Sequence, residues 1–166
     1  MHNETVITSL INNKAPLEVS LTPSGTFSFG SDKNSYIVGF VEDQTILDNN
    51  VYQLFIENVN KTKNTLSTKV FQTIIAIIEE FFAANDSAIL YICDVSDGKQ
   101  SARDRLFAIW FNSYEGKFNY TLSRVAIQID GIDYYASLLI SNLNPSYAEI
   151  LSAFNTFINE FISKIE

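Results

Sequence analysis

Residues 88–111, AILYICDVSDGKQSARDRLFAIWF, decide the fold that this sequence predicts. The first six residues are apolar and rich in β-branched and aromatic types, which is typical of a strand buried on both faces of a sheet. A short polar turn follows, and charged residues then mix with apolar ones in a pattern that predicts a half-buried helix. If the protein has a site, the carboxyl end of this strand is the first place to search.

Several short strands are predicted before this stretch. Apolar and polar residues alternate from Leu17 to Leu21 and again over residues 27–29, and a Pro-Ser-Gly turn separates the two runs. Two more strands are predicted at Tyr36–Val41 and Val51–Glu57. Short strands joined by turns indicate an antiparallel meander.

The remaining elements are helices and a hairpin. A nearly all-apolar helix is predicted after an N-cap at Ser67 or Thr68. Asp130–Gly131 is the strongest hairpin signal, and a last amphipathic helix covers Ser146–Ile165. The predicted fold class is therefore α+β: an N-terminal antiparallel strand meander, then helix–strand–helix–β-hairpin–helix, with one sheet and helices packed mainly on one face.

Length and composition predict one domain. With 166 residues, of which 46% are apolar, the chain can bury a sizeable core, and no internal repeat is visible. Residues 1–16 have weak periodicity and end at a proline, so we expect a mobile leader or a marginal strand around Val6 to Ile11. Residues 17–166 are expected to form a single α+β domain.

Charge and hydropathy narrow the classes of partner. The net charge is −8, and eleven Lys and Arg residues spread along the chain disfavour a nucleic-acid interface. No secretory signal or membrane-spanning run is visible, so a cytoplasmic location without membrane attachment is expected. The single cysteine, Cys93, lies in the predicted buried strand, where it is expected to behave as a small apolar residue.

The charged residues after the strand form the candidate binding cluster: Asp94, Asp97, Arg103 and Arg105. We expect Asp94 and Arg103 to form a buried or half-buried ion pair, and Arg105, two residues further along the helix, to be exposed. Asp97 is a candidate helix cap, and Ser101–Asp104 offers a second, capping-box-like start. The alternative to a binding site is that helix caps and local ion pairs account for all of these charged residues.

Catalytic motifs are missing from the sequence. The only histidine, His2, stands in the predicted leader, and there is no Cys-x-x-Cys, Gly-rich phosphate loop or His-Glu-x-x-His. Asp94 and Asp97 could hold Mg²⁺ with water, but further oxygen ligands are lacking. We therefore predict no catalytic residue, no metal and no cofactor.

Four patterns resemble a family of small bacterial proteins of unknown function: Thr73-Ile-x-x-Ile77-Ile78-x-x-Phe81-Phe82, Tyr91-Ile-Cys-Asp94-x-x-Asp97-Gly98, Arg103-x-Arg105-Leu106-Phe107-x-x-Trp110-Phe111 and Asn144-Pro145. The resemblance covers roughly residues 25–157. It implies a bacterial, cytosolic, stand-alone domain and no activity.

Two classes of function stay open. The first is a non-catalytic binding or regulatory module, of the antitoxin, immunity or defence-system type, which holds another protein through its acidic surface or an aromatic patch. The alternative is a phosphate- or nucleotide-handling enzyme with a site at the end of the strand Ala88–Cys93. Aromatic residues also cluster around the late hairpin, where a single-layer sheet could leave one face uncovered. A homodimer would cover this face, and the alternative is that the N-terminal leader or the last helix covers it within one chain.

Overall fold

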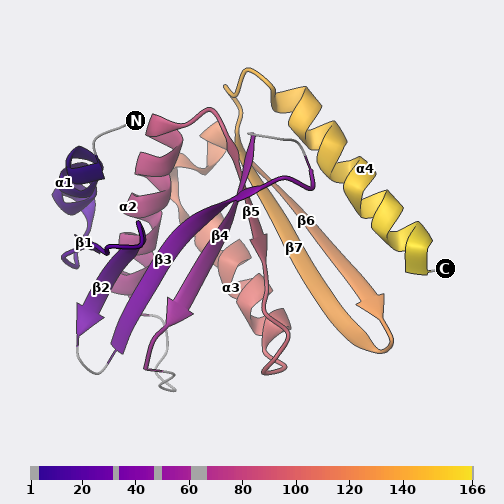
Figure 1. Cartoon of the computed structure of the whole chain (residues 1–166), viewed down its shortest axis with the longest axis horizontal. Coiled ribbons are helices and arrows are strands. Elements are labelled where there is room, and N and C mark those ends of the chain that lie inside the picture. Colours follow the sequence, from indigo (N-terminus) through magenta and orange to yellow (C-terminus); the bar gives the residue numbers. More distant parts are fainter. Residues whose placement is uncertain (1–3, 32–33, 47–49, 61–66, 166) are drawn as a thin grey trace. The chain divides into compact units, whose positions relative to one another are not determined.

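The computed structural model describes residues 4–31, 34–46, 50–60 and 67–165 (Figure 1). Over these residues it contains four α-helices and a seven-stranded mixed sheet with the strand order β1-β2-β3-β4-β5-β7-β6. The predicted α+β class, with a strand meander followed by helices that pack on the sheet, is confirmed. The elements are α1 (Glu4–Lys14), β1 (Ser20–Leu21), β2 (Phe27–Ser31), β3 (Asn34–Asp43), β4 (Val51–Asn58), α2 (Thr68–Ala84), β5 (Ala88–Ile92), α3 (Gln100–Ser113), the 3-10 helix η1 (Glu115–Asn119), β6 (Tyr120–Ile129), β7 (Ile132–Ser141) and α4 (Tyr147–Ile165).

The chain forms two compact units. The first consists of Met1–Phe40 and Phe55–Asn85, and the second of Val41–Leu54 and Asp86–Glu166. The strands β3 and β4 each contribute residues to both units. No helix among the described residues is both long enough and apolar enough to cross a membrane.

In the first unit, helix α1 occupies the segment where the sequence predicted a mobile leader or a marginal strand. The strand alternative is wrong, because Glu4–Lys14 is helical and Ile11 is completely buried. The Nζ of Lys14, the last residue of the helix, lies 2.6 Å from a carboxylate oxygen of Glu80 on α2, whose side chain is buried. The side-chain amide of Asn12 also bonds both backbone groups of Val19. The first residues of the described chain are therefore held to the unit by packing and hydrogen bonds.

Helix α2 has the cap that the sequence predicted. The Ser67 hydroxyl accepts a hydrogen bond from the Val70 backbone N–H at 3.3 Å, which satisfies one of the free donors in the first turn. Eight of its residues are buried, and Phe81 stacks on Phe40 of β3 with ring centroids 4.3 Å apart. Packing holds this isoleucine-rich helix, since β-branched residues are mildly unfavourable in helices.

In the second unit, β5 lies between β4, which it pairs in parallel, and β7, which it pairs antiparallel. Ala88 and Leu90 face a cluster that includes Phe154 of α4. Successive side chains of a strand point to opposite faces, and Tyr91 stacks on Phe107 of α3. The helices α3 and α4 therefore cover opposite faces of this part of the sheet (Figure 1).

The β6–β7 hairpin has the turn that the sequence predicted. Ten residue pairs run without interruption from Tyr120↔Ser141 to Ile129↔Ile132. Asp130 and Gly131 both have positive φ, 50° and 79°, which is the backbone conformation of a type I′ turn. A two-residue turn of this type fixes the register of the whole hairpin.

Candidate functional site

The ion pair after β5 joins different residues from those predicted. Arg103 of α3 binds the carboxylate of Asp97 through both Nη atoms, with Nη1 2.8 Å from Oδ1. The same Nη1 donates to the backbone carbonyl of Asp94 at 2.9 Å. The predicted Asp94–Arg103 ion pair is therefore wrong, because Arg103 reaches only the main chain of Asp94. The guanidinium of Arg103 also holds the pKa of Asp97 well below its usual range.

Asp94 uses its carboxylate locally. It accepts hydrogen bonds from the Ser96 backbone N–H at 3.0 Å and from the Ser96 hydroxyl at 2.8 Å. These bonds lower the pKa of Asp94, which is fully exposed. An aspartate carboxylate that accepts a hydrogen bond from the backbone two residues later in the chain commonly stabilises a polar turn.

Neither predicted cap of α3 forms. The helix begins at Gln100, and Asp97 accepts from the Lys99 backbone N–H at 3.1 Å, before the first turn. Ser101 and Asp104 both lie inside the helix. Asp104 is buried and pairs with Arg124 of β6, a partner that the sequence analysis did not identify.

Arg105 is exposed, as predicted. Within the described residues, no side chain forms an ion pair or hydrogen bond with its guanidinium. The structure thus brings Asp97, Arg103 and the Asp94 backbone together and leaves Arg105 apart. Arg105 is two positions after Arg103, and side chains two positions apart on a helix point about 200° from each other.

Two side chains next to this loop, Tyr91 and Cys93, have raised pKa values. Cys93 is buried, as predicted, and burial raises the pKa of its thiol to about 11. Burial likewise raises the pKa of Tyr91 to about 12. Both groups therefore stay protonated and neutral at physiological pH.

A groove along α4, which the sequence analysis missed, is a concave feature of the second unit. We call it the α4 groove; its volume is about 430 Å³. One wall is a face of α4 and the other is the turn after β3. The lining residues are Thr45, Ile46, Glu149, Ser152, Ala153, Thr156, Phe157 and Glu160.

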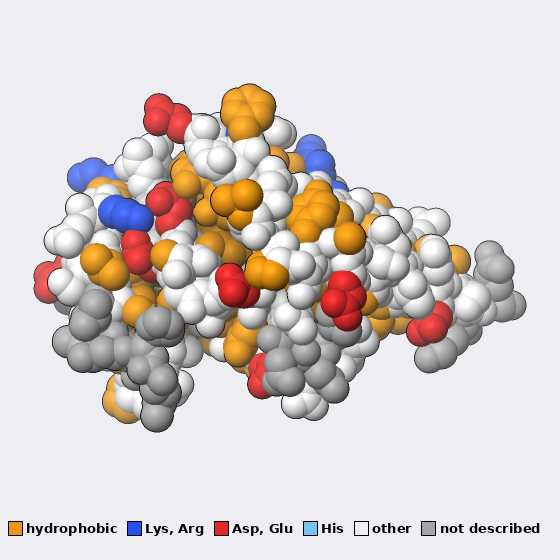
Figure 2. Space-filling model, turned by 90° about the horizontal axis from the view of Figure 1, so that it is seen from above, with side chains coloured by type: hydrophobic (Ala, Val, Ile, Leu, Met, Phe, Trp, Pro, Cys, Tyr) orange, Lys and Arg blue, Asp and Glu red, His pale blue; other side chains and the backbone are white. Residues whose placement is uncertain are grey.

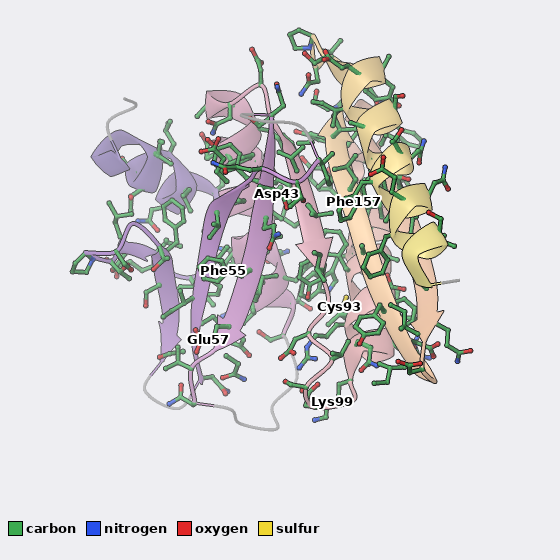
Figure 3. The ribbon with its side chains drawn as sticks, turned by 45° about the vertical axis from the view of Figure 1, so that its right-hand side comes forward. Asp43, Phe55, Glu57, Cys93, Lys99 and Phe157 are labelled. Atoms are coloured by element: carbon green, nitrogen blue, oxygen red, sulfur yellow. The ribbon has the colours of Figure 1, made fainter. Side chains whose placement is uncertain are left out.

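Asp43 holds the turn that forms one wall of the groove (Figure 3). Its carboxylate is buried and accepts hydrogen bonds from the Thr45 backbone N–H at 2.7 Å, the Thr45 hydroxyl at 2.6 Å and the Gln53 side-chain amide at 2.8 Å. Burial alone would raise the pKa of Asp43, but these hydrogen bonds outweigh it and lower the pKa. Asp43 is thus a positioning residue for Thr45 and the adjacent Ile46.

The α4 wall combines charge and apolar surface. Glu149 and Glu160 lie at its two ends, and the half-buried Phe157, which also packs against the core, lies between them (Figure 3). Figure 2 shows acidic side chains among hydrophobic ones on the face that it presents. The spacing of Glu149, Ala153, Phe157 and Glu160 along one helical face was the available sequence signal.

His2 lies outside the described residues. Within the described residues, no group of three or more His, Cys, Asp or Glu side chains is arranged to hold a metal ion.

The model of a family described as a family of unknown function (DUF6169) matches residues 67–156. This range contains all four patterns on which the resemblance in the sequence rested. No curated protein and no solved structure matches the chain.

Proposed function

Because the chain belongs to the family of unknown function DUF6169, whose description carries no activity, we propose a function from the α4 groove: the protein is a non-catalytic module that binds another protein. The bound segment is apolar in its middle and basic at its ends. A regulatory module of the antitoxin, immunity or defence type, one of the two classes that the sequence leaves open, would hold its partner in this way.

The observation that carries this proposal is the placement of the two glutamates. Glu149 and Glu160 are eleven residues apart on one helical face, which corresponds to about 16 Å along the axis. Phe157 on α4 and Ile46 on the opposite wall also line the groove and offer apolar contact. An amphipathic helix laid in the groove would bury its apolar face there and place a Lys or Arg near each glutamate.

The net charge of −8 supports the same kind of partner. An acidic surface attracts a cationic segment over long range and raises its association rate, and the effect falls as salt is added. The charged groups at the rim of the groove then contribute mainly to selectivity and on-rate, and the apolar contacts contribute to affinity.

Site-specific photo-cross-linking in the native cell tests the proposal. A photoreactive phenylalanine at Ser152, which lines the groove and is exposed, is expected to capture one partner. The same group at Asn155, which is exposed and does not line the groove, is the control and is expected not to capture it. Around α4, Asn155 lies about 60° from Ser152 and about 130° from the middle of the face that lines the groove.

Charge dependence separates a specific partner from chance capture. Glu149→Gln combined with Glu160→Gln should reduce the cross-linked product at least fivefold, whereas Glu115→Gln on η1 should leave it unchanged. Capture from Asn155 as efficient as from Ser152, or capture that the two groove substitutions do not weaken, would contradict the proposal.

A further inference from the structure

The outer strand β6 presents a row of unpaired backbone groups. In the part of the chain that the structure describes, β7 is the only strand that pairs with β6 (Figure 1). In a hairpin closed by a two-residue turn, the residues that flank the turn form a hydrogen-bonded pair, and such pairs then alternate along the strands. Ile129, Ile127, Val125 and Ser123 therefore bond to β7. The backbone N–H and C=O groups of Leu122, Arg124, Ala126 and Gln128 point away from it.

This edge lacks the features that usually protect one. Its ten pairs with β7 contain no bulge, and its sequence, YTLSRVAIQI, contains no proline and one charge. That charge belongs to Arg124, whose guanidinium is already paired with the buried Asp104. By comparison, the strand at the other end of the strand order, β1, is only two residues long. An open edge from Leu122 to Gln128, with its single charge neutralised, is a surface for strand pairing.

The free positions are arranged symmetrically about one residue. Leu122, Arg124, Ala126 and Gln128 are centred on Val125, so a two-fold axis at Val125 matches Leu122 with Gln128 of a second strand and Arg124 with Ala126. Each of these four outward positions then finds a hydrogen-bonding counterpart, as an isologous contact requires. We infer that two copies of this chain pair through β6, antiparallel about Val125, and join their sheets.

The side chains fit this register. Val125 and Ile127 point to the face that carries the α4 core cluster, and Arg124 points to the α3 face, where it meets Asp104. In the joined sheet Val125 lies opposite its own copy, and Ile127 lies opposite Ser123. Arg124 lies opposite Ala126, so two like charges never stand directly across from each other.

Sedimentation of the whole chain at micromolar concentration tests the pairing. The wild-type chain is expected as a species of twice 18.7 kDa. Ala126→Pro removes one outward N–H without removing a bond to β7, since proline is tolerated on edge strands where the N–H faces solvent. It should give an 18.7 kDa monomer with an unchanged circular dichroism spectrum, whereas Ala126→Thr, which keeps the N–H, should remain a dimer.

A disulfide test examines the register and does not depend on the proline variant. In the proposed ladder Val125 and its copy form a non-hydrogen-bonded pair with Cα atoms about 4.5 Å apart, within the range that a disulfide spans. Val125→Cys should therefore give a covalent dimer under mild oxidation. Ile127→Cys, on the same face but four residues out of register with its copy, should not.

Three outcomes would overturn the inference. A wild-type chain that stays monomeric at these concentrations excludes the pairing and leaves the edge to a strand of another protein. A folded Ala126→Pro variant that remains dimeric places the dimer interface elsewhere. Equal cross-linking of the two cysteine variants excludes the register centred on Val125.

Discussion

Arg103 and Arg105 are two residues apart on α3 and have different surroundings. Arg103 ties the loop after β5 to the helix through Asp97, and Arg105 extends into solvent. We keep Asp94, Asp97, Arg103 and Arg105 as a proposed binding cluster, in which Arg105 is the member free to touch a ligand or partner.

Arg105→Ala tests this cluster. Surface substitutions away from specific contacts change stability little, so the free energy of unfolding should stay within about 0.5 kcal/mol of the wild type. If the cluster binds a partner, the cellular phenotype should be lost, and Arg105→Lys should restore it in part. Urea unfolding and a phenotype assay measure the two effects. Full activity in a well-folded Arg105→Ala variant would leave these charges with structural roles alone.

Asp43 makes the stability of the groove wall depend on pH. Its pKa is lowered in the folded state, so its contribution is complete above the ordinary value of 3.8 and disappears as pH falls through the folded-state pKa. Asp43→Asn loses part of the hydrogen bonding and should cost about 1–3 kcal/mol at neutral pH.

Urea unfolding between neutral pH and about pH 3 should show this difference shrinking at the acid end. Asp86→Asn, which removes a charge from an exposed side chain, is the matched control and should behave as the wild type at neutral pH. A difference between Asp43→Asn and the wild type that grows toward acid would contradict the assignment.

At the scale of elements, α1 is held by one fully buried apolar side chain. Ile11→Ala removes it from a packed site and should cost about 2–5 kcal/mol, because the cavity that remains adds to the lost transfer free energy. Leu10→Ala, at a neighbouring residue that is 43% exposed, should cost under about 1 kcal/mol. Thermal or urea unfolding measures both. Equal small effects would show that residues 1–16 form a mobile leader.

Elements with a strong local signal could be predicted from the sequence, and those without one could not. Helix α2 has the cap residue Ser67 and a broad apolar face, and the β6–β7 hairpin has Asp130–Gly131. Helix α1 is mostly polar and has no such signal. Among its residues whose side chains the structure describes, Ile11 is the one that is fully buried. Its packing against α2 depends on contacts between residues far apart in the sequence.

The candidate site was harder to predict for the same reason. Two carboxylates, Asp94 and Asp97, follow the strand at spacings from which Arg103 could bind either. Spacing alone does not show that the Asp94 carboxylate accepts hydrogen bonds from Ser96 and that Arg103 therefore pairs with Asp97. The α4 groove brings together Ile46 and Phe157, which are separated in the sequence by about two thirds of the chain. A single sequence carries no signal for a contact between residues so far apart.

At the scale of the whole molecule, we propose that the two compact units unfold together as one domain. The strands β3 and β4 each have residues in both units. Unfolding of one unit would therefore unfold part of each strand and destabilise the other unit. Trp110, the only tryptophan, belongs to the second unit, whereas far-ultraviolet circular dichroism reports on both. The two signals should follow one denaturation curve, and separate midpoints would show two independent domains.

The position of β5 in the strand order has a consequence for synthesis on the ribosome. β4 has already been made when β5 emerges, but β7, the neighbour on its other side, begins about 40 residues later. At typical translation rates this delay lasts roughly 2–8 s. During that time the nascent chain exposes the open side of its most apolar strand, and closure waits for the β6–β7 hairpin to form and dock. Translation speed between β5 and β7 should therefore influence how much of the newly made protein aggregates before it is complete.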